Sequence, residues 1–249
     1  MPIFMTPRII NMKKLLATFF LVALGLIPQV GYAQEAVDLG LSVKWASCNV
    51  GASSPTDYGG LYAWGEIEEK EECFWHGYKW CAKIINDSLS ESERFSFLIL
   101  NNEIDLADLT KYCESDGKTR LDYSDDVARR KWGQKWRIPT DEEWTELREN
   151  CTWEWRGNCY KVISNKNGNS IFLPAAGMRD LDWLRIQAPE HGWYWSSSLD
   201  TENPKKAWHV SIGLEGECHY AWVWLPGTEK VERRSGDRFE GYSIRPVTE

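Results

Sequence analysis

Aromatic side chains that can bind a ligand are concentrated near the end of the sequence. Tyr220, Trp222 and Trp224 alternate along HYAWVWL, directly after His219. On a β-strand this spacing places the three rings on one face, where they can stack on a sugar ring or on the side chain of a partner. The alternative is a strand buried on both faces, because continuous apolar runs usually indicate burial.

A charged segment follows these aromatic residues. PGTEKVERRSGDRFEG, residues 226–241, is polar and flanked by glycine, so we predict a surface loop. Its arginines can hold carboxylates or sulfates through bidentate hydrogen bonds, although an ordinary solvated loop would have the same composition. The predicted ligand-binding residues are therefore His219, Tyr220, Trp222, Trp224, Arg233, Arg234, Asp237 and Arg238.

Other patterns that could indicate catalysis are incomplete. Asp141, Glu142 and Glu143 fall in the first turn of a predicted helix, where acids usually stabilise the helix end. GWYWSSS lacks the glycine pattern around a nucleophilic serine, and no sequence spacing reveals a carboxylate pair for glycoside hydrolysis. His209 and His219 supply two metal ligands at most. We predict no catalytic residue, no metal site and no cofactor.

The first 33 residues have the pattern of a secretory signal peptide. A basic stretch at Lys13 and Lys14 precedes an apolar run over residues 15–27, and GYA at residues 31–33 ends in a small residue. We expect cleavage after Ala33 and export of the rest of the chain to the periplasm, the cell surface or the extracellular space. No later apolar run is long enough to span a membrane.

Seven cysteines are an odd number for an exported protein, so at least one has no disulfide partner within the chain. Cys73 and Cys81 have the same separation as Cys151 and Cys159, and each pair can close a small loop. Buried thiols that act as small apolar side chains are the alternative. The sequence leaves both interpretations open.

Composition narrows the class of partner. The predicted signal peptide contains three basic residues and no acid, so its removal changes the formal charge from −8 to −11. An acidic chain is poorly suited to nucleic acid, whose phosphates are bound by Lys and Arg. Fifteen tryptophans indicate an aromatic core, a stacking surface or both. We assign Trp136, Trp144, Trp195 and Trp208 to the core, because their neighbours at helix or strand period are apolar.

Local patterns predict two helices and a series of short strands. In WRIPTDEEW, Thr140 and Glu143 form a capping box that starts a helix ending near Asn150. SDDVARRKWG predicts another helix, with Ser124 as the N-cap and Gly133 as the C-cap. Residues 67–120 are interpreted as an insertion, and residues 34–249 as a single α+β domain. Strands are predicted at 37–45, 61–66, 160–164, 170–174, 192–198, 206–213, 218–227 and 241–247, with an Asn-Gly hairpin turn between the third and the fourth.

Six segments occur in an order that is similar to a known family. VDLGLSVKWA, GGLYAWGE, KWRIPTDEEWTEL, SIFLPAAG, GWYWSSS and SIRPV resemble the Fibrobacter succinogenes major paralogous domain. They also resemble the DUF1566 group, which includes the C-terminal domain of the Legionella collagen-like protein. Both groups are similar to C-type-lectin-like domains, among them formylglycine-generating sulfatase-modifying domains. The resemblance implies that residues 37–43 pair with residues 242–247, that two helices pack beside the sheet, and that ligands bind in loops between the late strands.

The expected function is that of an exported, noncatalytic recognition module. Its predicted partner is a glycan or a cell-surface protein, of anionic character because of the arginines, bound through the late loops. One alternative is an enzyme, either a divergent sulfatase-modifying oxidase or a carboxylate-dependent hydrolase, since one fold can carry several functions. Another is a structural subunit of a surface appendage. Nucleic acid is not an expected partner, and the mature chain is expected to have no transmembrane segment.

Overall fold

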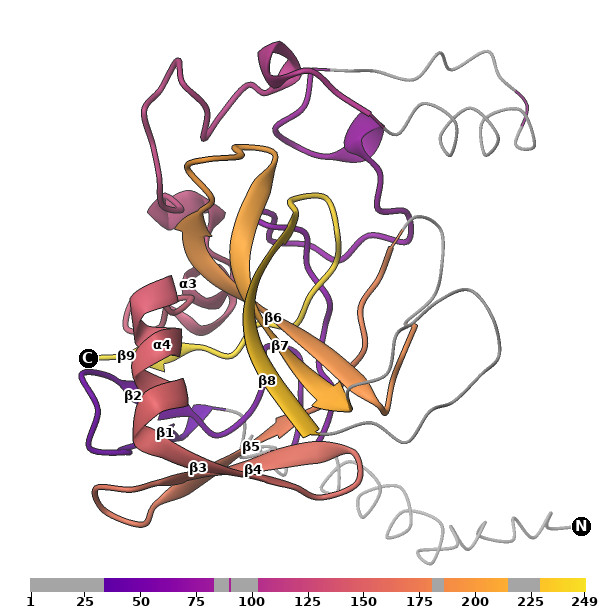
Figure 1. The fold of residues 1–249 in the computed structure, drawn as a ribbon. Coiled ribbons are helices and arrows are strands. Elements are labelled where there is room, and N and C mark those ends of the chain that lie inside the picture. Colours follow the sequence, from indigo (N-terminus) through magenta and orange to yellow (C-terminus); the bar gives the residue numbers. More distant parts are fainter. Residues whose placement is uncertain (1–33, 83–89, 91–102, 181–185, 215–228) are drawn as a thin grey trace, which may run out of the picture. The chain divides into compact units, whose positions relative to one another are not determined.

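The computed structural model of the protein describes residues 34–82, 90, 103–180, 186–214 and 229–249. All of them fall in one compact unit of the chain. Two α-helices and three small antiparallel sheets are found among these residues, which is an α+β arrangement (Figure 1). The predicted signal peptide at residues 1–33 lies outside the described residues.

The two helices begin at side-chain caps. α4 (Asp141–Asn150) starts with the predicted capping box: Thr140 Oγ1 accepts from the Glu143 N–H at 3.2 Å, and Glu143 Oε2 accepts from the Thr140 N–H at 2.8 Å. α3 (Val127–Trp132) ends at Gly133 as predicted, but its N-cap is Asp126 and not Ser124. The Asp126 carboxylate accepts the Arg129 N–H at 3.1 Å, so a second acid in SDD supplies the cap.

The largest sheet has the order β6–β7–β8, from β6 (His191–Leu199), β7 (Lys206–Leu214) and β8 (Glu229–Asp237). β6 and β7 confirm the strands predicted there. β8 lies inside the segment that was predicted to be a surface loop, so that prediction is wrong for residues 229–237. Its backbone pairs continuously with β7, from Lys206 opposite Asp237 to Leu214 opposite Glu229. An edge strand tolerates charged side chains, which is why its composition resembles that of a loop.

A second sheet follows α4 directly and contains β3 (Cys151–Trp155), β4 (Cys159–Ser164) and β5 (Ser170–Pro174). The β4–β5 hairpin confirms the predicted Asn-Gly turn, with Gly168 at a φ of 77°. In this sheet Cys151 lies opposite Ser164, five residues along β4 from Cys159. At ~3.3 Å per residue that separation exceeds the reach of a disulfide, so this pair cannot close the loop considered for it.

The second cysteine pair does not form a disulfide either. Cys73 is a free thiol, 4% exposed, in a cluster with Trp75 and Leu109. Burial raises the pKa of Cys73 to about 12 and that of Cys151 to about 11, so both thiols stay protonated at neutral pH. They act as small apolar side chains.

The start and the end of the described chain meet in a third sheet, β1–β2–β9, with β1 (Ala36–Val37), β2 (Lys44–Ala46) and β9 (Val247–Thr248). Trp45 lies opposite Val247. Pairing of the two ends is therefore confirmed, but it uses residues 44–46 and not residues 37–43. The predicted strand at 37–45 is interrupted by a turn at Gly40, which has a φ of 68° and donates its N–H to Asp38.

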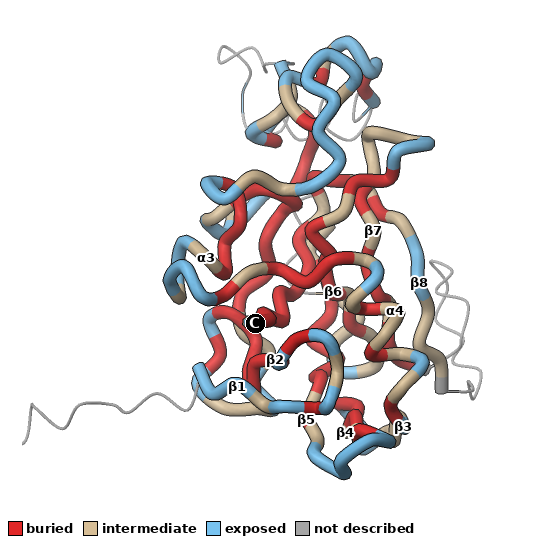
Figure 2. Tube along the Cα trace, turned by 90° about the vertical axis from the view of Figure 1, so that its left-hand side faces the viewer, coloured by how far each residue is buried: buried red, intermediate tan, exposed pale blue. Residues whose placement is uncertain are grey.

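Three of the four tryptophans assigned to the core are buried. Trp136, Trp144 and Trp195 are 7%, 1% and 0% exposed. Trp208 is only partly buried, so its assignment to the core is wrong. Figure 2 shows buried stretches along β6 and along the segment that leads to the C-terminus. The core also encloses Arg245, whose guanidinium donates to Asn49 Oδ1 and to the carbonyls of Ala46 and Phe172.

Candidate anion-binding site

The structure separates the predicted ligand-binding residues into three groups. His219, Tyr220, Trp222 and Trp224 lie outside the described residues. Arg233, Arg234 and Asp237 lie on β8. Arg238 follows β8 and is completely buried.

Arg238 is a structural residue and not a ligand contact. Its Nε donates to Tyr78 Oη at 3.0 Å, Nη1 to the carbonyls of Tyr112 and Pro204 at 3.1 and 2.8 Å, and Nη2 to the carbonyl of Lys111 at 2.9 Å. Within the described part of the chain it has no carboxylate partner. The carbonyl dipoles and the rings of Trp64 and Tyr78, each 5.2 Å away, replace water around its charge.

Arg233 reaches the surface and is held in a defined orientation. Its guanidinium lies 3.2 Å from the centroid of the Trp208 ring, and its Nε is 2.9 and 2.8 Å from the two carboxylate oxygens of Asp141. Asp141 is the first residue of α4. Burial raises the pKa of Asp141, and the hydrogen bond from Arg233 only partly opposes this. The Arg233 side chain remains 39% exposed, so its outer donors face solvent.

The other two predicted residues on β8 are less suited to binding a ligand. Arg234, with a 58% exposed side chain, pairs with Glu232, which also pairs with Lys230 at 2.7 Å. Asp237 is only partly exposed, and burial raises its pKa. Of the predicted ligand-binding residues on β8, Arg233 is therefore the one whose side chain is both exposed and held in a fixed orientation.

Three arginines from other parts of the chain line a polar pocket of about 330 Å³. Arg120 precedes α3, Arg129 lies within α3, and Arg137 precedes α4. Ser197 of β6 forms part of the wall. The remaining lining residues are Leu121, Asp126, Ile138 and Glu249.

The three arginines differ in how far their charges are neutralised. Arg137 makes a bidentate pair with Glu143 at 2.7 and 2.6 Å and also reaches Glu249 at 3.2 Å. Arg129 has its Nε 3.7 Å from Asp126. Arg120 donates from Nε to Ser197 Oγ at 3.2 Å and forms no ion pair among the described residues, although its charge contributes to the lowered pKa of Glu143. Arg120 is thus the cation best placed to hold an anionic ligand.

The carboxylates around the pocket respond to these partners. Burial alone would raise the pKa of Glu143, but hydrogen bonds from Arg137 and from the Thr140 N–H hold it below its usual value. Burial raises the pKa of Asp126, although the N–H groups of Ile138 and Arg129 donate to it.

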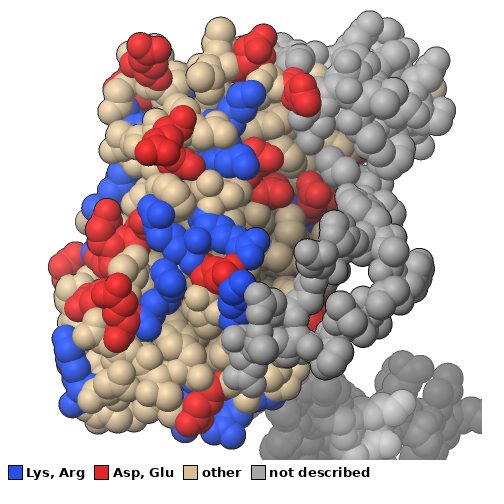
Figure 3. Space-filling view, viewed as in Figure 1, with Lys and Arg blue, Asp and Glu red and all other residues tan. Residues whose placement is uncertain are grey.

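Two neighbouring serines of β6 connect the pocket to Arg233. Ser197 accepts from Arg120, and Ser198 Oγ accepts the N–H of Asp141 at 3.2 Å. Figure 3 shows Lys and Arg side chains next to Asp and Glu side chains on the face of the molecule that carries α4 and β8. We call Arg120, Arg129, Arg137 and Arg233 the arginine surface.

Sequence reasoning found only Arg233 of this surface. The other three arginines are separated from it by about a hundred residues. Arg129 lies in a predicted helix, Arg137 lies just before another, and Arg120 is the last residue of the segment interpreted as an insertion. Only the tertiary fold brings them together. The sequence contains one local indication of this surface: Arg137 lies only six residues before Glu143, with which it pairs.

His209, considered as half of a metal pair, is a buried core residue. It is 3% exposed between the rings of Trp195 and Tyr242, at centroid distances of 5.6 and 4.9 Å. Burial lowers the pKa of His209 to about 3. His219 lies outside the described residues. Within the described ranges, no group of three or more His, Cys, Asp and Glu side chains could hold a metal ion.

No helix within the described ranges is long and apolar enough to cross a membrane. Comparison of the chain with protein-family models, with curated proteins and with solved structures finds no match. The geometry of the arginine surface therefore carries the functional assignment.

Proposed function

We propose that this protein is a recognition module that binds an anionic glycan at the arginine surface. The observation that supports this most is Arg120, whose guanidinium lies in a polar pocket beside Arg129 and Arg137 without an ion-pair partner in the described part of the chain. A guanidinium presents planar, paired donors that match sulfate and carboxylate groups. The ligand class is thus a glycan bearing such groups.

Arg233 extends the surface across the start of α4. Its guanidinium is oriented by Trp208 and Asp141, so little side-chain entropy remains to be lost on binding. The arginines lie among the carboxylates of Asp126, Asp141, Glu143 and Glu249. The attraction for an anion is therefore carried mainly by Arg120, which has no ion-pair partner among the described residues. That attraction weakens as salt screens the exposed charges.

We also infer export of the module and a C-type-lectin-like fold. Pairing of the first and last strands and the two helices in an α+β arrangement support the fold. The basic and apolar pattern of residues 1–33 supports export. His219, Tyr220, Trp222 and Trp224 remain proposed ligand contacts.

The proposal is tested with a heparin-derived tetrasaccharide, its desulfated form and a poly-glutamate peptide, titrated calorimetrically at low and high salt. The sulfated sugar should bind, more weakly as salt rises, and the desulfated sugar should not. Arg120→Ala should weaken binding by roughly tenfold to a hundredfold, since hydrogen bonds to charged groups contribute about 1.5–3 kcal/mol. Arg130→Ala, an exposed α3 arginine outside the pocket, is the matched control and should bind normally.

Two results would contradict the proposal. Undiminished tetrasaccharide binding by Arg120→Ala would place the site elsewhere. Tighter binding of poly-glutamate than of the tetrasaccharide would identify the partner as an acidic peptide.

A further inference from the structure

Tyr123 is an exposed aromatic residue at the edge of the polar pocket lined by Arg120, Arg129 and Arg137, which we call the arginine pocket. Tyr123 and Leu106 are the large apolar side chains that remain exposed among the described residues, at 46% and 53%. The Arg129 guanidinium lies over the Tyr123 ring, 5.1 Å from its centroid. An exposed ring therefore adjoins a pocket that contains three guanidinium groups, so one ligand can contact both.

The backbone next to Tyr123 is held in place by hydrogen bonds to distant parts of the chain. The Leu121 N–H donates to the Ser197 carbonyl of β6 at 3.0 Å. The Asp122 N–H donates to the buried Tyr112 hydroxyl at 2.9 Å. The ring is thus carried by a fixed segment, and little conformational entropy is lost from the backbone when a ligand binds there.

The two acids of the same segment are neutralised by lysines. Asp122 lies 2.7 Å from Lys111 Nζ and 2.5 Å from Lys118 Nζ. Asp125, whose side chain is 2% exposed, lies 2.5 Å from the same Lys111 Nζ. Since opposite charges at this range largely cancel each other's field, neither acid is left to repel an anionic ligand that approaches Tyr123.

We propose that the arginine pocket and Tyr123 together bind a sulfated pyranose, with a sulfate beside Arg120 and the sugar ring stacked on Tyr123. The two residues are three positions apart, so their Cα atoms lie within about 11 Å of each other, a distance that a short oligosaccharide spans. Arg129 covers one side of the tyrosine ring, and the exposure of the residue leaves another side for the sugar.

This inference rests on the proposed function and adds selectivity to it. Arg120 would bind a sulfate on any carrier, because a guanidinium recognises the anionic group alone. A tyrosine ring supplies rigid contact area at low entropic cost, and that area is used only by a ligand with a flat apolar face. The site therefore prefers a sulfated sugar ring to the same sulfates on a flexible chain.

Two polyanions with the same charged group test this selectivity: the heparin-derived tetrasaccharide and a short poly(vinyl sulfate), which contains no ring. Both are titrated calorimetrically into the protein and into Tyr123→Ala. The variant should bind the tetrasaccharide at least about fivefold more weakly, as expected when an aromatic contact residue is truncated. Its affinity for poly(vinyl sulfate) should stay within about twofold, since the change lies on the surface and Arg120 is retained.

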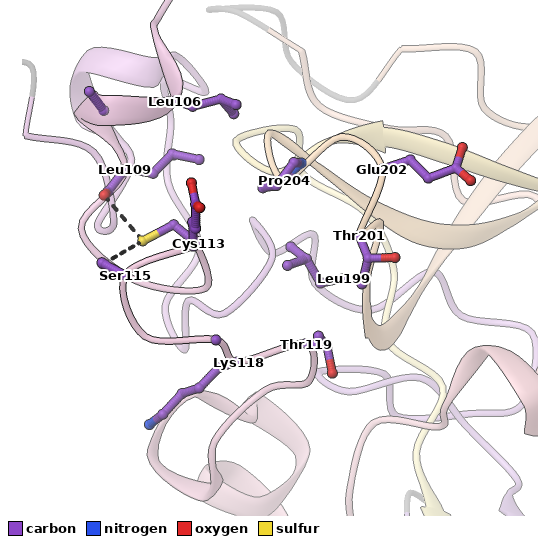
Figure 4. A pocket seen from close by; sticks show the side chains of 13 residues that line it. Leu106, Leu109, Cys113, Ser115, Lys118, Thr119, Leu199, Thr201, Glu202 and Pro204 are labelled. Carbon is purple, nitrogen blue, oxygen red and sulfur yellow. Dashed lines mark hydrogen bonds between the residues drawn. The ribbon is translucent and has the colours of Figure 1, made fainter.

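Three further variants separate ring stacking from other effects. Tyr123→Phe keeps the ring and should bind both polyanions as the unchanged protein does. Arg120→Ala removes a charge and should weaken both. Leu106→Ala removes another exposed apolar side chain, at a cleft that shares no lining residue with the arginine pocket (Figure 4). It is the control and should change neither affinity.

The possible failures are distinguishable. If Arg120→Ala weakens tetrasaccharide binding and Tyr123→Ala does not, the proposed function stands and the inference about Tyr123 is wrong. An equal loss of both polyanions in Tyr123→Ala would also overturn the inference, because Tyr123 would then only orient Arg129. Tetrasaccharide binding that Arg120→Ala does not weaken, or no binding at all, would overturn the proposed function and the inference with it.

Discussion

Arg233 covers one face of Trp208, with its guanidinium 3.2 Å from the ring centroid. Trp208 is therefore a platform for an arginine and offers no free ring to a sugar on that face. Because the same guanidinium is bonded to Asp141, the ring and the carboxylate together fix its orientation at the point where α4 meets β8.

The contact between Trp208 and Arg233 should be measurable as a coupling energy. Unfolding free energies of Trp208→Ala, Arg233→Ala and the double variant should give a coupling of ~0.5–2 kcal/mol, as expected for a partly exposed cation–π pair. Trp208→Ala should also cost less than the roughly 3–5 kcal/mol expected for Trp195→Ala in the core. Additive single effects, measured by urea denaturation, would show that the stacking contributes nothing.

Replacement of Arg238 should damage the fold and not merely a ligand contact. Arg238→Ala leaves three carbonyls and the Tyr78 hydroxyl without their donor, so the unfolding free energy should fall by at least ~3 kcal/mol. Arg238→Lys should recover only part of the loss, because an ammonium cannot reproduce the planar guanidinium. Arg234→Ala, an exposed arginine on β8, is the control and should change stability by ~0.5 kcal/mol or less. Equal stability of the Arg234 and Arg238 variants would refute the structural role.

Two buried groups should give the stability an unusual dependence on pH. Burial lowers the pKa of His209 from its ordinary value of 6.5 to about 3 in the folded protein. Its contribution to the unfolding free energy is therefore lost as the pH falls from 6.5 to 3. Burial raises the pKa of Glu240 from 4.5 to about 8, with nearby Asp237 and Asp180 adding to the shift, so its contribution is lost as the pH rises from 4.5 to 8. Between pH 4.5 and 6.5 the two slopes oppose each other.

In Glu240→Gln, the pH dependence of the unfolding free energy should therefore be that of His209 alone, without the opposing effect of Glu240. In that variant the unfolding free energy should fall by up to ~1.4 kcal/mol per pH unit below pH 6.5. The unchanged protein should show a flatter response between pH 4.5 and 6.5 in denaturation curves recorded across that range. Identical curves for the two proteins would mean that Glu240 does not hold its proton in the folded state.

Cys151 and Cys159 should remain unlinked even under oxidising conditions. They lie at opposite ends of the β3–β4 pair, beyond the reach of a disulfide. Peptide mapping by mass spectrometry without reduction should yield both as separate thiol peptides after alkylation of the unfolded protein. A peptide linked through Cys151 and Cys159 would show that the β3–β4 register is wrong.

Several elements could be predicted because their causes lie within a few residues. The capping box of α4 depends on Thr140 and Glu143, and the β4–β5 hairpin depends on the Asn-Gly turn. Burial of Trp144 and Trp195 follows from apolar neighbours at helix and strand period. Such short-range interactions are visible in sequence because the chain brings these residues together whatever the rest of the fold does.

Local sequence patterns could not predict which of Arg233 and Arg238 is exposed. They lie five residues apart in one charged segment, yet the first is exposed on an indole ring and the second is buried among carbonyls. Their difference arises from Trp208 and Asp141 on one side and from Tyr78, Lys111 and Pro204 on the other, all distant in sequence.

The sequence by itself determined the acidic balance, the local helix and hairpin signals and the burial of Trp136, Trp144 and Trp195. The tertiary structure alone decided that residues 229–237 form an edge strand, that Arg120, Arg129 and Arg137 meet in one pocket, and which arginines remain exposed. The physical reason is that backbone pairing with β7 and the desolvation of a guanidinium depend on groups that only the folded chain brings into contact.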